Sequence, residues 1–193
     1  MPRRELRILF CLIRAITRSL LVKEGTNVLL GEIAHIYQPQ TITGLQMSSA
    51  GKYPVYGANG IIGYHVAFNH TTSQICIACR GNTCGALNYS IPFSWITGNS
   101  MVINVDECSN MVDKRYLFHL LATIDFTPLI SGSGQPQIVR SPLQKLPIVL
   151  PTIEEQRHIA TILDAMDERL KCEEGVLSAF QVSKRAMTTR LFI

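Results

Sequence analysis

The C-terminal segment, residues 151–193, carries an apolar pattern that constrains the fold more than any other feature. From residue 159 onward, the rungs of this pattern are spaced by alternating steps of four and three residues. A period of 3.5 is typical of a coiled-coil seam rather than of the broader face of a helix that lies on a globular core. From residue 159 to residue 191 such a helix reaches about 50 Å at about 1.5 Å per residue, which suits a spacer or dimerisation arm. The rungs are Ile159, Leu163, Met166, Leu170, Glu173, Leu177, Phe180, Lys184, Met187 and Leu191.

The two charged rungs predict how such an arm pairs with a second copy. If Glu173 of one arm faces Lys184 of the other, the arms are antiparallel and Leu177 meets Phe180. A parallel pair would instead place like charges against each other in the seam, which costs stability. We therefore predict an antiparallel homodimer, in which Leu170 meets Met187 and Met166 meets Leu191. The alternative is a helix that folds back on its own domain or on residues 4–22.

Charge is distributed unevenly along the 193 residues, whose net charge is +4. Residues 1–24 carry six basic and two acidic groups, residues 25–150 six and five, and residues 151–193 six and seven. We predict three parts with these bounds: an N-terminal helix, a globular domain and a long arm. The N-terminal helix is interpreted as a dimer element or the remnant of a helix repeat, with a leader lacking fixed structure as the alternative. The central domain is nearly neutral, so tight binding to phosphates would need a partner.

The central domain reads as a mixed α/β (α+β) fold with a twisted β-sheet. Glycine and asparagine turns separate short apolar segments rich in β-branched residues, which is typical of strands. Residues 114–124 form the clear internal helix pattern, with apolar side chains on one side. Strands are predicted at residues 27–30, 53–56, 61–66, 74–78, 100–105 and 146–149.

The six cysteines do not form a framework of disulfide spacings. The apolar stretch at residues 8–13 is too short for a signal peptide or a membrane span, so we expect a cytoplasmic protein with reduced thiols. The spacing of Cys76, Cys79 and Cys84 is compatible with zinc, but no fourth ligand lies at a usual distance. Strand alternation would point Cys76 and Cys79 to opposite faces. We therefore predict buried, inert thiols and no metal.

Signals for catalysis are sparse. The sequence has no glycine-rich nucleotide turn and no P-loop lysine, and the few carboxylates of the domain suggest no acid–base pair. We predict a protein that is not an enzyme, with no catalytic residues and no cofactor. A catalytic domain with an unfamiliar site is the alternative.

Planar amide and cationic side chains gather in the turn-rich segments of the domain. Amide and guanidinium groups can read base edges bidentately, while glycines let backbone amides approach phosphates. Each such residue alone is also typical of an ordinary turn. Together they give a candidate DNA-binding set: Lys52, Tyr56, Asn59, Tyr64, Arg80, Asn82, Asn99, Gln135, Gln137 and Arg140.

Several motifs in a fixed order make the chain similar to a known family. The runs are LGEIA at residues 30–34, YPVYGANG at 53–60 and EEQRHIA at 154–160, the last at the start of the arm. With these motifs, the chain resembles the specificity subunit of type I restriction-modification systems from about residue 28 onward.

The resemblance implies a non-catalytic reader of double-stranded DNA. Full-length members have two target-recognition domains, each followed by a long helix, and the two helices pair in antiparallel fashion. This chain, with one domain and one helix, looks like half of such a subunit. Its implied partners are adenine-methylating modification subunits and, through the complex, a translocating restriction subunit. Two copies would present two surfaces to inverted half-sites. The alternative is a coiled-coil interaction module that does not bind DNA.

Overall fold

The computed structural model describes residues 17, 19–21, 24–44, 47, 50–132 and 134–191, without the side chains of 186 and 189–191. Most of the predicted N-terminal helix therefore lies outside the described residues, and so does the side chain of the last seam position, Leu191. The described N-terminal residues 17 and 19–21 are helical. Leu21 is buried in the main core and Leu20 packs partly against it, so this segment contacts the rest of the fold.

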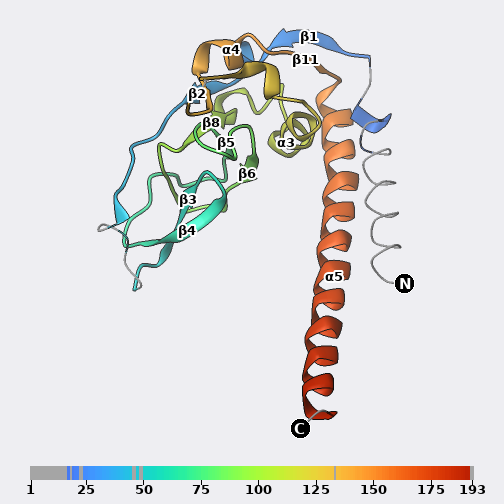
Figure 1. The fold of residues 1–193 in the computed structure, drawn as a ribbon. Coiled ribbons are helices and arrows are strands. Elements are labelled where there is room, and N and C mark those ends of the chain that lie inside the picture. The colour runs from blue at the N-terminus through green and yellow to red at the C-terminus, as the bar shows by residue number, and fades with distance from the viewer. Residues whose placement is uncertain are drawn as a thin grey trace.

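A two-stranded ribbon brings the two ends of the globular part together. Strand β1 (Thr26–Leu29) pairs antiparallel with β11 (Pro147–Leu150), placing Asn27 opposite Val149. Helix α5 (Ile153–Leu191) begins directly after β11 and leaves the globular part as a long arm (Figure 1). The ribbon therefore sets the point from which the arm departs.

The described strands form four small sheets in place of the single predicted sheet. The largest has four antiparallel strands in the order β2-β8-β5-β6, and a three-stranded sheet has the order β4-β3-β7, in which β7 runs parallel to β3. The strand bounds are β2 (His35–Tyr37), β8 (Ser100–Asn104), β5 (Ile75–Ala78), β6 (Leu87–Tyr89), β4 (Gly60–His65), β3 (Tyr53–Gly57) and β7 (Trp95–Ile96). A further hairpin joins β9 (Ile130–Ser131) to β10 (Gln137–Ile138). Strands of two or three residues are too short to show alternation, which is why β2, β6, β7, β9 and β10 were not predicted.

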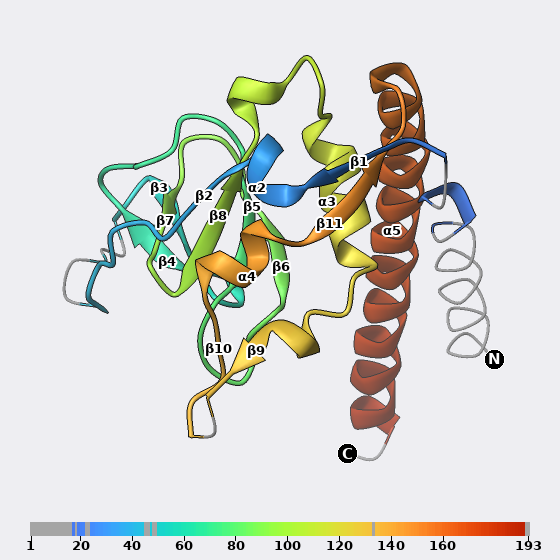
Figure 2. The ribbon, with the colours of Figure 1, turned by 90° about the horizontal axis from the view of Figure 1, so that it is seen from above.

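Helix α3 (Lys114–Ala122) lies between the sheets and α5 in both ribbon views (Figures 1 and 2). It begins where the Asp113 carboxylate accepts a hydrogen bond from Tyr116 N at 2.9 Å, a common N-terminal cap. The predicted helix at 114–124 is thus confirmed, apart from its last two residues. Two shorter helices, α2 (Leu30–Ile33) and α4 (Arg140–Gln144), were not expected, and Leu30 begins α2 instead of ending a strand. Single 3-10 turns occupy Asp106–Cys108 and Thr127–Leu129.

Two clusters of apolar side chains cover the opposite faces of β5 and β8. The main cluster contains Ile75, Ile77 and Ile103, with Tyr116 and neighbouring residues of α3. The second cluster contains Cys76 and Val102 with Tyr56 and Ile96. Burial on both faces explains why β5 reads as a nearly continuous apolar run. Together with the long C-terminal helix, this architecture confirms the predicted mixed α+β class.

The apolar seam of α5 divides into two parts with different roles. Its first rungs, Ile159 and Leu163, belong to the main core and are each 2% exposed, and Met166 packs against that core. Farther along, Phe180 and Met187 are 69% and 66% exposed. The expectation that the whole seam serves pairing is therefore corrected for Leu163, whose side chain is already covered by its own domain. Among the described residues beyond Asp167, Val176 and Val182 are exposed as well.

Candidate nucleic-acid interface

The loop after β5 and the segment around β10 meet on one flank of the domain. Arg80 and Gln137 form an isolated antiparallel bridge. Gly81 N donates a hydrogen bond to the Pro136 carbonyl at 3.1 Å, and Ile138 N donates to the Cys79 carbonyl at 3.1 Å. Two of the predicted DNA-binding residues, far apart in the sequence, are thereby held side by side.

A pocket of about 210 Å³ lies at this junction. Two arginines and two glutamines are among the residues that line it, and none of the described lining residues is acidic. Such groups hydrogen-bond base edges and phosphate oxygens, and cations without nearby carboxylates favour a polyanion. The lining residues are Gln38, Cys79, Arg80, Met101, Gln137, Ile138, Val139 and Arg140.

Three other predicted residues do not line this pocket but lie close to lining residues, either in the sequence or through a backbone hydrogen bond. Asn82 is exposed and follows Gly81, whose φ of 84° is in the left-handed region that glycine tolerates. Asn99 is exposed, and its carbonyl accepts a hydrogen bond from Cys79 N at 3.1 Å. Gln135 is exposed in the turn between β9 and β10. We call this group the pocket face; it consists of Gln38, Arg80, Asn82, Asn99, Gln135, Gln137 and Arg140.

Gln38 belongs to the pocket face although it was absent from the predicted set. Its Nε2 donates to the Gly98 carbonyl and lies 3.5 Å from Cys79 Sγ, which holds the side chain at the wall. The segment that carries Gln38 packs closely against residue 98. A glycine is needed there, because a Cβ at residue 98 would lie 2.8 Å from the Pro39 carbonyl oxygen. The local sequence held no signal for this role, since the contact joins residues 60 positions apart.

The remaining predicted residues lie on the β3–β4 hairpin, away from the pocket. Lys52, Asn59 and Tyr64 are exposed there, and the Lys52 ammonium lies 5.7 Å from the centre of the Tyr53 ring. Tyr56 is only 6% exposed, and its hydroxyl accepts a hydrogen bond from Ile91 N at 3.2 Å. Because its side chain is part of the core, we leave Tyr56 out of any contact surface.

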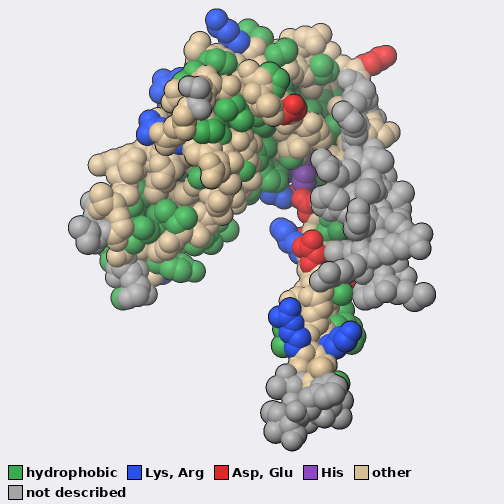
Figure 3. All heavy atoms as spheres, viewed as in Figure 1, with side chains coloured by type: hydrophobic (Ala, Val, Ile, Leu, Met, Phe, Trp, Pro, Cys, Tyr) green, Lys and Arg blue, Asp and Glu red, His purple; other side chains and the backbone are tan. Residues whose placement is uncertain are grey.

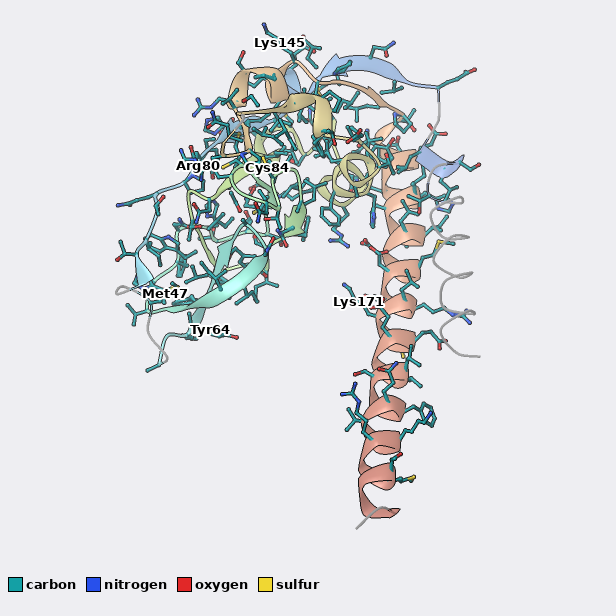
Figure 4. All side chains as sticks on the ribbon, viewed as in Figure 1. Met47, Tyr64, Arg80, Cys84, Lys145 and Lys171 are labelled. Carbon is teal, nitrogen blue, oxygen red and sulfur yellow. The ribbon has the colours of Figure 1, made fainter. Side chains whose placement is uncertain are left out.

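Positive charge on the domain is concentrated near the pocket face. Lys114 is paired with Asp106, and Arg115 with Asp164. Within the described residues, the structure gives no ion pair to Arg80, Arg140 or Lys145. Figure 4 places Arg80 on the flank of the domain opposite α5 and Lys145 at its top, and lysine and arginine side chains gather over that shoulder in Figure 3. Lys145, the C-cap residue of α4, was missed because an isolated surface lysine carries no sequence signal.

A tyrosine–histidine–asparagine chain is the strongest candidate for catalysis. His70 Nδ1 lies 2.6 Å from Asn69 Oδ1, and its Nε2 lies 2.8 Å from the Tyr37 hydroxyl. Asn69 Oδ1 also accepts from Ile96 N at 2.9 Å, so the side chain tethers β7 to this loop. Burial lowers the pKa of His70, which favours the neutral ring. Because His70 is buried, we assign a structural role to this tyrosine–histidine–asparagine series of hydrogen bonds.

The described residues contain no group of three or more histidine, cysteine or acidic side chains that could hold a metal ion. Burial raises the pKa of Cys76 to about 12 and also raises the pKa of Cys79, so both are weakly reactive thiols. They lie in opposite apolar clusters, which confirms the predicted divergence of the two side chains. No helix in the described part of the chain combines the length and apolarity needed to cross a bilayer.

Comparisons with known proteins concern the family and the fold of the chain. The family model described as type I restriction modification DNA specificity domain matches residues 23–179. The EcoprrI type I restriction enzyme specificity subunit of Escherichia coli is 30% identical over 148 residues, which cover 75% of this chain and 36% of that protein.

Two solved structures share the fold. An S subunit of a type I restriction-modification system from M. genitalium has a TM-score of 0.67 at 20% identity, with 83% of this chain and 42% of that chain covered. The HsdS subunit from Thermoanaerobacter tengcongensis has a TM-score of 0.64 at 17% identity, with 91% and 47% covered. The chain thus spans less than half the length of each of these proteins. By the extent of the family match, it belongs to the type I restriction-modification DNA specificity domain family.

Proposed function

We propose that this chain is a non-catalytic reader of DNA sequence for a type I restriction-modification complex, and that it reads one half-site through the pocket face. The observation that carries the proposal is the pocket lined by Arg80, Gln137 and Arg140, in which no described lining residue is acidic and neither arginine has an ion pair with a described residue. Family membership supports it. We assign residues 25–150 to the recognition domain and residues 151–193 to the arm.

Partners supply the chemistry in this proposal. Residues 25–150 hold six basic and five acidic groups, so the domain alone neutralises few phosphates. Sequence discrimination would come from this chain, while adenine methylation, base extrusion and DNA translocation would come from modification and restriction subunits. The isolated chain is therefore expected to bind DNA weakly, with a shallow dependence on salt.

The distal arm supports the proposed antiparallel pairing with a second copy. Among the described residues, the contacts between α5 and the domain extend to Met166 and Asp167, and the proposed register, with Glu173 opposite Lys184, overlaps the arms from about Met166 onward. In that register, the Leu163 residues of the two arms lie about 46 Å apart along the axis, at about 1.5 Å per residue. This distance corresponds to about 14 base pairs at about 3.4 Å each. Two copies would then read inverted half-sites at a fixed separation.

Alanine substitutions in the assembled complex test the pocket face. Arg80→Ala and Gln137→Ala should each cost about 1–3 kcal/mol on the recognised sequence and relax its specificity, as expected for base-reading groups. Arg169→Ala, an exposed arginine on α5, is the matched control and should leave target choice unchanged. Binding and target choice that stay intact in both pocket variants would place the reading surface elsewhere. A wild-type complex that binds no duplex would favour a DNA-independent interaction module.

A further inference from the structure

A polar cluster joins α3 to the proximal part of the arm. Arg115 Nε lies 3.0 Å from both carboxylate oxygens of Asp164, and Arg115 Nη2 donates to Oδ1 as well. His119 Nε2 lies 2.7 Å from Asp164 Oδ1, and His119 Nδ1 lies 3.9 Å from Asp167 Oδ2. One carboxylate of the arm is therefore held by two side chains of the domain, 45 and 49 residues away in the sequence.

A second polar contact lies two turns earlier on α5. Gln156 is 1% exposed and makes three hydrogen bonds of 2.9 Å. Its Oε1 accepts from Asp113 N, while its Nε2 donates to the carbonyls of Met111 and Pro151. The amide thus ties the first turn of the arm to the backbone that caps α3. The first contact joins α5 to α3, and the second joins α5 to the residues just before α3.

The arginine is itself held in place by the domain. Its guanidinium carbon lies 4.4 Å from the centre of the Tyr89 ring and 5.5 Å from that of Phe118. Arginine packed on aromatic rings loses freedom before it meets the carboxylate, so the bidentate contact has one preferred geometry. Asp164 is consequently attached to a fixed point of the β6–α3 surface.

We propose that Gln156, Arg115, Asp164 and His119 act as an angle clamp that fixes the orientation of the recognition domain on its arm. The clamp thereby determines which spacing between two half-sites the complex accepts, an inference that rests on the proposed function. The apolar contacts of Ile159 and Leu163 are non-directional and tolerate rotation or tilt of the helix. Charge-assisted and amide hydrogen bonds are directional, and they restrict the helix to one orientation. The clamp residues are positioning residues that do not themselves touch DNA.

Spin-label distances in the purified full chain, at concentrations at which it is monomeric, test the clamp independently of DNA. One label is placed on Cys172, which is exposed on the arm, and the other on a cysteine that replaces the exposed Ser141 of α4, after Cys11, Cys84 and Cys108 are changed to serine. Arg115→Met and Gln156→Leu should each broaden the distance distribution. Lys114→Met is the matched control, because it breaks an ion pair on the same helix that does not involve the arm. An unchanged distribution in both clamp variants overturns the proposal.

The accepted spacing is read from methylation sites in DNA exposed to the assembled complex. Wild type and Lys114→Met should methylate sites with one spacer length, whereas Arg115→Met should lose that restriction and retain the same half-site sequences. Arg115→Lys keeps the charge but not the bidentate geometry, and it covers the case in which Arg115→Met does not fold. Broader distances with an unchanged spacer would overturn the link to spacing. If the wild-type complex methylates no specific site, the proposed function fails, while the distances still decide whether the clamp exists.

Discussion

Truncation of two leucines on the same helix and in the same apolar pattern should lower the free energy of unfolding by very different amounts. Leu163 is 2% exposed and packs in the main core with Ile159 and residues of α3, whereas Leu177 is partly exposed on the distal arm. Truncating a fully buried leucine removes its burial energy and leaves a cavity, which costs about 2–5 kcal/mol. We expect Leu163→Ala to lower the free energy of unfolding by about 3 kcal/mol, and Leu177→Ala by less than about 1 kcal/mol in the monomer.

Urea unfolding measures this difference when it is followed by the fluorescence of Trp95, the only tryptophan of the chain. It is run at concentrations at which the chain is monomeric, because dimer formation would add to the apparent stability. Sedimentation at higher concentration supplies the reciprocal result: Leu177→Ala should weaken self-association, and Leu163→Ala should leave it unchanged. Equal losses of unfolding free energy for the two variants would refute the division of the arm into a domain-bound and a free part.

Three further outcomes follow from the same structure. Lys184→Glu should weaken the dimer by placing a like charge opposite Glu173, and adding Glu173→Lys should restore it; sedimentation that shows no rescue contradicts the antiparallel register. In the folded chain at pH 8, Cys76 should stay unmodified by iodoacetamide while Cys172 reacts, because burial raises the pKa of Cys76 to about 12; peptide mass spectrometry would expose the opposite result. Partial burial alone would raise the pKa of Asp164, but hydrogen bonds from Arg115 and His119 outweigh it and hold this pKa below its ordinary value. A depressed carboxyl pKa stabilises the fold above the unfolded value of about 4, and this stabilisation is lost as the pH falls from there through the folded pKa. The urea midpoint of the wild type should therefore fall as the pH is lowered below about 4, and that of Asp164→Asn should fall less.

The local sequence pattern was sufficient to predict the elements that are long or that are bounded by clear turn residues. The run at residues 53–60 combines β-branched and aromatic residues with a Gly–Asn turn, and the structure has β3 and β4 there. The 3.5-residue period predicted the long arm, and α5 extends over Ile153–Leu191. The same period could not distinguish Leu163 from Leu177, because periodicity shows that a helix face is apolar but not what covers it.

The candidate site was predictable only in part. Arg80 and Gln137 were selected as turn residues that could read bases, and the structure brings them together. Gln38 joins the pocket face through a tertiary contact, and Lys145 follows a short helix at the top of the domain; neither feature leaves a local signal. Tyr56 was selected from a motif that also forms a strand, and its inward orientation depends on the bulge and register of that strand.

Mapping methylated adenines in DNA from cells that carry this chain as the sole specificity chain, together with its modification subunits, tests the central claim most directly. Two identical recognition domains on antiparallel arms predict a bipartite site whose halves are the same sequence in inverted orientation, separated by one fixed spacer. Different sequences in the two halves, or methylation without a sequence pattern, would contradict the account.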